Sequence, residues 1–562
     1  MTYFESFRFD QGYTYVIDKD GNEFLFCDQI AINRIIMNIE TKELDVEIGI
    51  SQIEGSVATF TCPRSEVISS PFELLTKYGL SLAKSHVNEV TVTEILLETE
   101  LEAELCYCHK SLGFKVINGK TYFLSKNAIP NQLKSSYYRK DYLTSCGTFN
   151  EWCVGFRKLL PDNPYLLPAI AMGITAPIAS ILTISNMLDE TLIWSLVGMS
   201  SKGKTTMLMA AASVWGLPNN HGILGAMNGT DNYIITSIAN QNGFPVFFDE
   251  TTAKRSQDFT KLIYDIGLSR EGGRCRADGT EREPRTWSGA VITTGERSML
   301  DSSLGYGGMH ARVIEFDAQW TKDAESSEAI KNLALSQFGT AYVPIVKKLM
   351  KLGNDAVVEG CKRCMDELKK LFNPTTGIEE RITKKLGVLL FACEIISQTC
   401  NLSIKREILL EFMQAVFRNN APESDIINNC YNSFLEYVST HAQQFPASYT
   451  SASHLKYGVR AVNNNRDCIW VMNDFFKRFL KDRGLTDTAE TLRIMHERHM
   501  IARVYDRFRI QRTVDDHKTL CLCVYLNNDP EIKTQKVTYK TITKEYVNPL
   551  LQNQNLCRSD IQ

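Results

Sequence analysis

The sequence lacks an excess of charge of either sign. Its 562 residues carry 62 Lys and Arg against 65 Asp and Glu, which leaves a formal net charge of −3. Such a chain has no overall attraction to nucleic acid, so any such binding must depend on local basic patches or on a ring that concentrates charge in a channel. Its length predicts roughly three or four domains.

Features of secreted proteins and of metal sites are also missing. The first residues, MTYFESFRFD, contain no basic segment followed by an apolar run, so no secretory signal is expected. The 16 cysteines are scattered, which fits a reducing compartment and predicts a cytoplasmic protein. Two clusters, CYCH ending at His109 and CKRC ending at Cys364, lack the second ligand pair typical of structural zinc. We interpret them as thiols on packed elements.

Only one long apolar run is present. Residues 163–188 contain no charged residue and are long enough to form a membrane-spanning helix. Pro168, Gly173 and Pro177 interrupt the run, and a phosphate-binding pattern begins soon after it, at Gly198. We therefore expect two buried helices broken near Pro177 and no membrane partner.

The pattern of elements predicts four parts. Residues 1–130 alternate apolar runs with turn signals such as Asp20-Gly21 and Asn118-Gly119, which indicates a small α+β domain. Residues 131–330 alternate helical patterns with the strands IWSLV, FPVFF, GAVIT and ARVIEF, which predicts an α/β core. Residues 331–445 are helix-rich and are interpreted as a lid. Residues 446–562 end in a helix followed by two strands, the pattern of a winged helix.

A phosphate-binding loop is the strongest motif. Residues 198–205, GMSSKGKT, match GxxxxGK[ST] between a strand-like segment and a helical one, which is the context the pattern requires. Its backbone N–H groups would surround the phosphates, Lys204 would reach the β and γ oxygens, and Thr205 would hold Mg²⁺. A chance glycine-rich turn is the alternative. The residues predicted to bind ATP here are Gly198, Ser200, Ser201, Lys202, Gly203, Lys204, Thr205 and Thr206.

Polar residues at the ends of later strands supply the expected catalytic partners. The strand PVFFDE ends in Asp249, the predicted Mg²⁺ partner, and in Glu250, which would polarise an attacking water and so favours hydrolysis. On the next strand Thr294, or Thr293 beside it, would orient this water, unless both simply end a buried strand.

Arg312 begins the fourth predicted strand. In ring-shaped ATPases an arginine in this order of elements reaches the γ-phosphate held by the neighbouring subunit and stabilises the transition state. A surface ion pair with Glu315 is the alternative interpretation.

Residues 272–287, GGRCRADGTEREPRTW, predict a hairpin with an Asp-Gly turn. Arg274 and Arg276 alternate on one arm and share a face, and Arg282 lies on the other arm. In a ring these arginines would line a channel for a nucleic-acid backbone. Two glutamates nearly neutralise the hairpin, so a self-paired surface ribbon is the alternative.

Together, GMSSKGKTT, PVFFDE, the GGRCRADGT hairpin, ITTGER and ARVIEF resemble the helicase-type AAA+ ATPases of phages, plasmids and genomic islands grouped under a domain of unknown function. They are especially similar to the replicative helicases of staphylococcal cassette chromosomes and the Rep initiators of staphylococcal pathogenicity islands. The resemblance implies a homo-hexameric ring that grips DNA with the hairpin. It also implies that the lid residue Arg381 touches nucleotide. Gly295 departs from the Asn usual in superfamily 3 helicases, and no primase motif is found.

A basic segment near the C-terminus is the candidate for binding duplex DNA. Residues 493–512 contain six arginines against Glu497 and Asp506, with Tyr505 and Phe508 between them. A winged helix that contacts only protein is the alternative. The predicted phosphate contacts are Arg493, Arg498, Arg503, Arg507 and Arg509.

These features predict an ATP-driven, ring-forming DNA helicase that starts the replication of a mobile element. The first alternative is a nucleotide-switched regulator that assembles on DNA without unwinding it. The second is a structural or membrane-associated ATPase built on the apolar run at 163–188.

Overall fold

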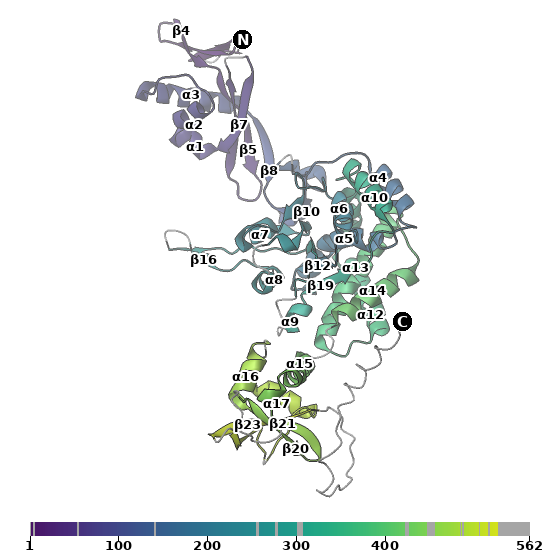
Figure 1. Cartoon of the computed structure of the whole chain (residues 1–562). Helices are drawn as coiled ribbons and strands as arrows, with labels where there is room; N and C mark the ends of the chain where they lie inside the picture. Colours follow the sequence, from purple (N-terminus) through teal and green to yellow (C-terminus); the bar gives the residue numbers. More distant parts are fainter. Residues whose placement is uncertain are drawn as a thin grey trace, which may run out of the picture. The chain divides into compact units, whose positions relative to one another are not determined.

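The computed structural model forms two compact units, Met1–Glu423 and Ser424–Gln562 (Figure 1). The structure describes residues 2–3, 6–52, 55–139, 142–254, 258–275, 279–300, 307–421, 426–446, 456–483, 485, 488–504, 506–514 and 517–526.

The N-terminal part combines two sheets with three helices. A small antiparallel sheet contains β1 (Thr2–Tyr3), β2 (Phe7–Asp10), β3 (Tyr13–Ile17) and β4 (Glu23–Asp28). A second sheet has the order β11-β8-β5-β6-β7, formed by Ser135–Tyr137, Glu104–His109, Ile30–Asn38, Leu44–Ser51 and Val57–Pro63. The helices that share its core are α1 (Arg64–Ser69), α2 (Pro71–Lys77) and α3 (His86–Glu102). The predicted hairpin at Asp20-Gly21 is confirmed by the antiparallel pairing of β3 with β4.

A second predicted hairpin, β9 (Leu112–Ile117) with β10 (Lys120–Leu124), is also confirmed. Asn118 and Gly119 both have positive φ, 50° and 75°, as the two-residue turns preferred in hairpins require. This hairpin pairs with β14 (Gln241–Asn242), and its Phe114 and Phe123 lie in the large core of the central region.

The central sheet is parallel and has the order β13-β15-β18-β12-β19. Its strands are Leu224–Ala226, Val246–Asp249, Ala290–Thr294, Leu192–Val197 and Val313–Asp317, so the four strands expected in this region are confirmed. Alternate residues face two cores: Trp194 and Phe247 lie in one, and Ile193 and Phe248 in the other. Helices therefore cover both faces, as parallel sheets require.

The first core contains α4 (Phe149–Leu159), α5 (Leu166–Ile184) and α6 (Lys204–Ser213), together with the helices that follow the sheet. These later helices are α10 (Ala324–Ser336), α11 (Tyr342–Leu352), α12 (Asn354–Phe372), α13 (Gly377–Cys400) and α14 (Arg406–Asn420). The second core contains α7 (Asp231–Ile238), α8 (Thr260–Gly267) and α9 (Gly307–His310). Short 3₁₀ turns lie at η1 (Asn131–Leu133), η2 (Thr251–Ala253) and η4 (Ala442–Gln444).

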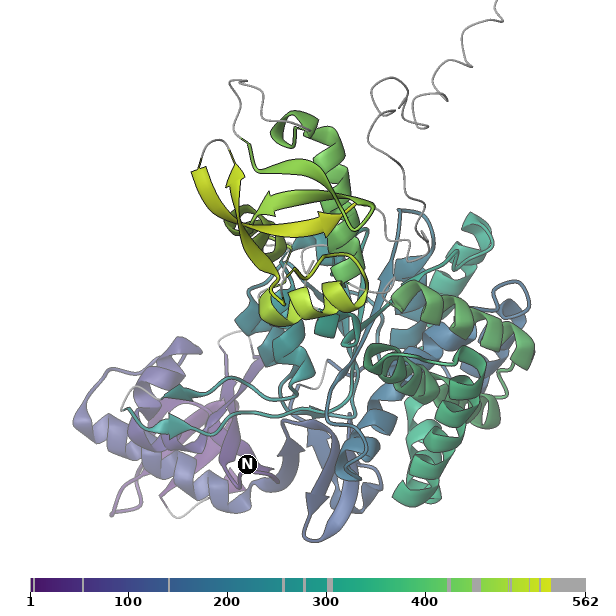
Figure 2. The same ribbon diagram turned by 90° about the horizontal axis from the view of Figure 1, so that it is seen from below.

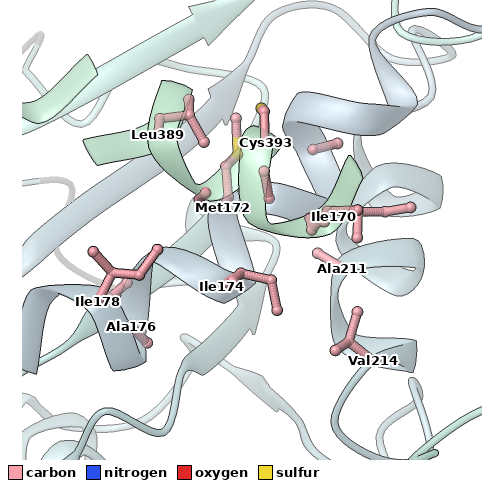
Figure 3. Packing of buried hydrophobic residues seen from close by; sticks show 14 of the residues in the cluster. Ile170, Met172, Ile174, Ala176, Ile178, Ala211, Val214, Leu389 and Cys393 are labelled. Atoms are coloured by element: carbon pink, nitrogen blue, oxygen red, sulfur yellow. The ribbon is translucent and has the colours of Figure 1, made fainter. Parts of the chain in front are cut away.

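The apolar run forms one continuous helix, α5, so the prediction of two helices broken near Pro177 is wrong. Pro177 removes one backbone hydrogen bond, at a cost of about 3 kcal/mol in an exposed helix. Here side chains of α6 and α13 surround α5, and their packing outweighs that loss (Figure 3). The helix is long and apolar enough to cross a membrane, with a mean hydropathy of 1.9, but 89% of that window is buried inside the molecule.

The arginine-rich hairpin extends from the second core as β16 (Arg274–Cys275) and β17 (Glu281–Arg282), beyond α7 and α8 (Figures 1 and 2). Arg274 pairs with Arg282 across the two strands, which confirms the expected hairpin. Gly279 has a φ of 81°, as a turn residue there requires. Arg276 and Asp278 lie outside the part of the chain that the structure describes.

The C-terminal unit has a sheet of order β20-β21-β23-β22, from Gly458–Asn463, Arg466–Met472, His517–Tyr525 and Arg509–Val514. Its helices are α15 (Ile426–Thr440), α16 (Asn473–Lys481) and α17 (Thr488–Glu497). The expected helix followed by two paired strands is present as α17, β22 and β23. The unit begins before residue 446 because Tyr431 and Phe434 of α15 share a core with Phe476 and Phe479 of α16.

Candidate functional site

The glycine-rich loop, residues 198–203, joins the carboxyl end of buried β12 to α6. Gly198 and Gly203 have φ of 120° and 85°, values that favour glycine. A Cβ on Gly203 would lie 2.8 Å from the side chain of Thr321, so close packing against the segment after β19 also requires glycine there. The loop therefore brings backbone N–H groups to the N-terminus of α6, where anions are stabilised.

Lys204 is folded back over this loop. It is only 8% exposed, and its Nζ donates hydrogen bonds to the carbonyl oxygens of Gly198 at 2.7 Å and Met199 at 2.8 Å. Lys202 forms an ion pair with Asp317 at 2.5 Å, and Ser200 donates a hydrogen bond to Glu296. An incoming phosphate would replace two carbonyl contacts of Lys204 with charge-assisted ones.

Hydroxyl and carboxylate groups from three neighbouring elements meet beside the loop. Thr205 Oγ1 on α6 lies 3.2 Å from Asp249 Oδ1 at the end of β15, and Thr294 at the end of β18 donates to the same carboxylate. Two ligands about 2.1 Å from an octahedral Mg²⁺ lie about 3 Å apart, so the Thr205 and Asp249 oxygens fit adjacent positions on one ion.

Glu250 has a strained backbone, with φ of 58° in the left-handed region. Its N–H donates to Thr294 Oγ1 at 3.1 Å, and its Oε1 accepts from Thr252 N at 3.2 Å. The exposed carboxylate is thereby held at the pocket wall. Thr293, in contrast, is buried with its hydroxyl 3.7 Å from Met299 Sδ, so of the two candidate threonines only Thr294 contacts the acidic pair.

A pocket of about 450 Å³ lies above the loop, within the usual range for small-molecule sites. Of the predicted residues, eight line it: Ser200, Ser201, Gly203, Lys204, Thr205, Thr206, Glu250 and Thr294. Sequence reasoning missed its far wall: Glu296, Gln319, Thr321, Asp323, Ala324, Ser327, Glu328 and Lys331. The cap that Asp323 forms with Ser326 N, at 2.7 Å, is a recognisable helix-start signal after β19.

Arg312 and Arg381 lie at the other edge of the sheet. Arg312 precedes β19, level with the start of β12, and Arg381 pairs at 3.2 Å with Glu190, which also precedes β12. The six residues of β12 span about 20 Å, so both arginines are far from the glycine-rich loop of their own chain. Lys385 of α13, which the sequence analysis did not single out, joins them: its Nζ lies 3.3 Å from Glu190 and donates to the Arg312 carbonyl at 2.9 Å.

The base of the hairpin is held by a buried acid. Glu271, 6% exposed, pairs with Arg285 at 2.8 Å and lies 3.6 Å from Arg282, and the hydrogen bond from Arg285 is the main cause that lowers the pKa of Glu271 to about 2. Trp287 anchors the second arm by donating from Nε1 to the Ile266 carbonyl at 3.1 Å. Arg282 is one of the residues predicted to contact DNA, and Glu271 partly neutralises its charge.

The C-terminal arginines lie on or beside α17 and β22. Arg493 forms an exposed pair with Glu497 at 2.6 Å, and Arg503 contacts the Asp506 carbonyl at 3.2 Å. Arg498 and Arg507 are exposed, and Arg509 is half-buried. The exposed arginines are accessible for contacts with a phosphate backbone. Two of them, Arg493 and Arg503, also pair with the carboxylates of Glu497 and Asp506. Tyr505 lies outside the described residues.

Two family models match the chain. Residues 10–286 match a domain of unknown function, DUF927, and residues 425–531 match the Cch helix turn helix domain. The first segment is thus similar to the DUF927 domain, and the second is similar to the Cch helix turn helix domain. No curated protein matches the chain.

Among solved structures, "SCCmec type IV Cch - active helicase" shares the fold: 20% identity, 94% of this chain and 98% of that chain covered, and a TM-score of 0.72. The predicted resemblance to this helicase family is therefore confirmed. "The A form apo structure of NrS-1 C terminal region" matches at 11% identity, 87% and 96% coverage and a TM-score of 0.28, too low to support an argument.

Proposed function

We propose that this protein is an AAA+ P-loop ATPase of the cytoplasm that hydrolyses Mg²⁺-ATP to translocate on DNA and unwind it, and that it initiates replication of a mobile element. The observation that carries the proposal is that Lys204, Thr205, Glu250 and Thr294, from one helix and two parallel strands, line one pocket. Asp249 joins them through its contacts with Thr205 and Thr294. Each supplies one part of phosphoryl-transfer chemistry.

In this site the loop 198–203 and Lys204 bind the phosphates, while Thr205 and Asp249 would hold Mg²⁺, which would neutralise charge on the phosphate oxygens. Glu250 accepts a proton from the attacking water, and Thr294 orients Glu250 and Asp249 through its two hydrogen bonds. The strained backbone of Glu250 supports this role, since such strain is common at catalytic positions.

We infer a homo-hexameric ring, and the separation of Arg312 and Arg381 from the loop of their own chain supports the action of these arginines between neighbouring copies. Side chains about 20 Å from one nucleotide act on hydrolysis only at a site in an adjacent copy. Arg381, with a side chain 41% exposed, is available for such a contact.

For DNA, two elements support the proposal. The projecting hairpin with Arg274, Arg276 and Arg282 suits contact with a single strand in a ring channel. The C-terminal unit, with a helix-turn-helix match and exposed Arg498, suits recognition of origin duplex through a winged helix.

Strand displacement on a forked DNA with Mg²⁺-ATP tests the proposal. We expect unwinding by the wild type and its loss, with hydrolysis reduced by about 100-fold or more, in Lys204→Ala, because the β and γ oxygens lose their cation. Lys347→Ala, at an exposed lysine of α11 outside this pocket, is the matched control and should retain unwinding.

Each result has a distinct meaning. Hydrolysis without strand displacement would contradict the helicase and favour a nucleotide-switched DNA-binding regulator. Equal hydrolysis by wild type and Lys204→Ala would contradict the nucleotide site itself.

A further inference from the structure

Lys385 is a charged side chain enclosed by protein. It is 1% exposed on α13, between the start of β12 and the start of β19. A buried ammonium is costly unless it is paired and hydrogen-bonded, so its partners must be specific. They are the carboxylate of Glu190 at 3.3 Å and the main-chain carbonyl of Arg312 at 2.9 Å.

Glu190 holds a second cation. Its side chain is 11% exposed and lies 3.2 Å from Arg381, one turn before Lys385 on α13. One carboxylate thus fixes both Arg381, which is exposed, and Lys385, which is not. Removal of Glu190 would leave Lys385 without its counter-ion and Arg381 without an anchor.

Arg312 occupies a fitted slot. Its Nη1 donates to the Gly308 carbonyl at 2.8 Å, and its guanidinium lies 4.4 Å from the ring centre of Tyr264. A Cβ on Gly308 would lie 3.1 Å from Nη1, and one on Gly267 would lie 3.3 Å from Cδ. Gly308 and Tyr264 therefore hold the guanidinium, and Lys385 holds the backbone from which the Arg312 side chain extends.

We propose that Glu190 and Lys385 form a clamp that positions Arg312 and Arg381 together, so that both engage the nucleotide held by a neighbouring copy. This inference rests on the proposed function and adds two positioning residues to it. Neither Glu190 nor Lys385 touches the nucleotide. Because Glu190 precedes β12 and the glycine-rich loop follows it, one strand connects the clamp to the chain's own phosphate site.

DNA-stimulated hydrolysis by Glu190→Gln and Lys385→Met tests the clamp. A displacement of about 1 Å at a catalytic group costs about 100-fold in rate, so we expect kcat to fall to that extent. Affinity for a fluorescent ATP analogue should change by less than about twofold, because the loop is about 20 Å away. The exposed neighbours provide matched controls, Asp189→Asn and Lys384→Met, which should keep the wild-type kcat.

A pH profile separates positioning from a purely structural role. Burial, opposed by Glu190, lowers the pKa of Lys385 to about 8. The charged groups that face Lys385 are Glu190, Arg381 and Arg312. We expect kcat to decline above about pH 8 in the wild type and in Lys384→Met as Lys385 loses its proton. Lys385→Met, whose kcat is already low, should not show this decline above pH 8.

Wild-type kcat in both clamp variants would overturn the clamp and leave the proposed function intact. Absence of hydrolysis in the wild type would overturn the proposed function as well. If Lys385→Met fails to fold, Glu190→Gln decides, because it keeps the size of the side chain while removing the negative charge that pairs with Lys385 and Arg381.

Discussion

At the scale of single residues, the site depends on which way neighbouring side chains point along a strand. Thr293 and Thr294 are adjacent in sequence, but strand geometry sends them to opposite faces of the sheet. Only Thr294 reaches the carboxyl pair, donating to Asp249 and accepting from the Glu250 N–H. The Thr293 hydroxyl instead lies in the second core beside Met299.

We therefore expect Thr294→Val to lower kcat for hydrolysis by about 100-fold, since Glu250 and Asp249 lose the hydroxyl that orients them, with ATP-analogue affinity nearly unchanged. Steady-state hydrolysis and fluorescence titration measure the two quantities. The Thr293 hydroxyl contacts Met299 and not the acidic pair, so Thr293→Val should keep kcat within about threefold. An equal loss of kcat in Thr294→Val and Thr293→Val would contradict the assignment of Thr294 as the orienting residue.

At the scale of elements, the hairpin is an arm with a rigid base. Trp287 and the buried Glu271 tie its two arms to the second core, while Gly272 and Gly273 next to the base have no neighbouring atoms that would contact a Cβ. The positions of β16 and β17 therefore depend on the contacts at the base of the hairpin rather than on packing around these two glycines.

This ion pair makes hairpin stability depend on pH. The pKa of Glu271 falls from an ordinary 4.5 to about 2, so the carboxylate contributes stability above about pH 4.5 and loses it as the pH falls toward 2. We expect Glu271→Gln to increase hydrogen exchange in residues 270–287 at pH 7. The difference from wild type should shrink as the pH falls from 4.5 toward 2.

The exposed Glu283→Gln on the same hairpin is the control and should exchange like the wild type at every pH. A difference between Glu271→Gln and wild type that stays constant down to pH 2 would show that the ion pair does not hold the base.

At the scale of the whole molecule, one chain carries two halves of a proposed site on opposite edges of one sheet. Asp249 lies at the carboxyl end of β15 and contacts Thr205 on α6, whereas Arg312 lies at the amino end of β19. Parallel strands place all their carboxyl ends on one edge, so the two halves cannot meet within a chain. They meet only if copies of the chain assemble side by side.

Mixing inactive variants tests this arrangement. Lys204→Ala keeps Arg312, and Arg312→Ala keeps the loop, so mixed oligomers contain some complete sites. We expect each variant alone to lose about 1,000-fold in hydrolysis and the mixture to recover a measurable fraction of wild-type activity. A mixture as inactive as its components would contradict action between subunits.

The sequence alone determined the parallel α/β core, its four main strands and the acidic strand end, because hydrophobic periodicity and glycine-rich spacing are local signals. It also determined the hairpins at Asn118-Gly119 and at 272–287, since two-residue turns have strict residue preferences. The continuity of α5 through Pro177 could not be predicted, because burial on all sides overrides the local cost of proline.

Only the tertiary structure decided which distant residues meet. The choice of Thr294 over Thr293, the far wall of the pocket on α10 and the contacts of Lys385 with Glu190 and Arg312 each join segments separated by tens to hundreds of positions. Such contacts follow from strand order and helix packing, and no local pattern encodes them. For the same reason the position of Arg312 and Arg381, at the edge of the sheet away from the loop, became visible only once the strands were ordered.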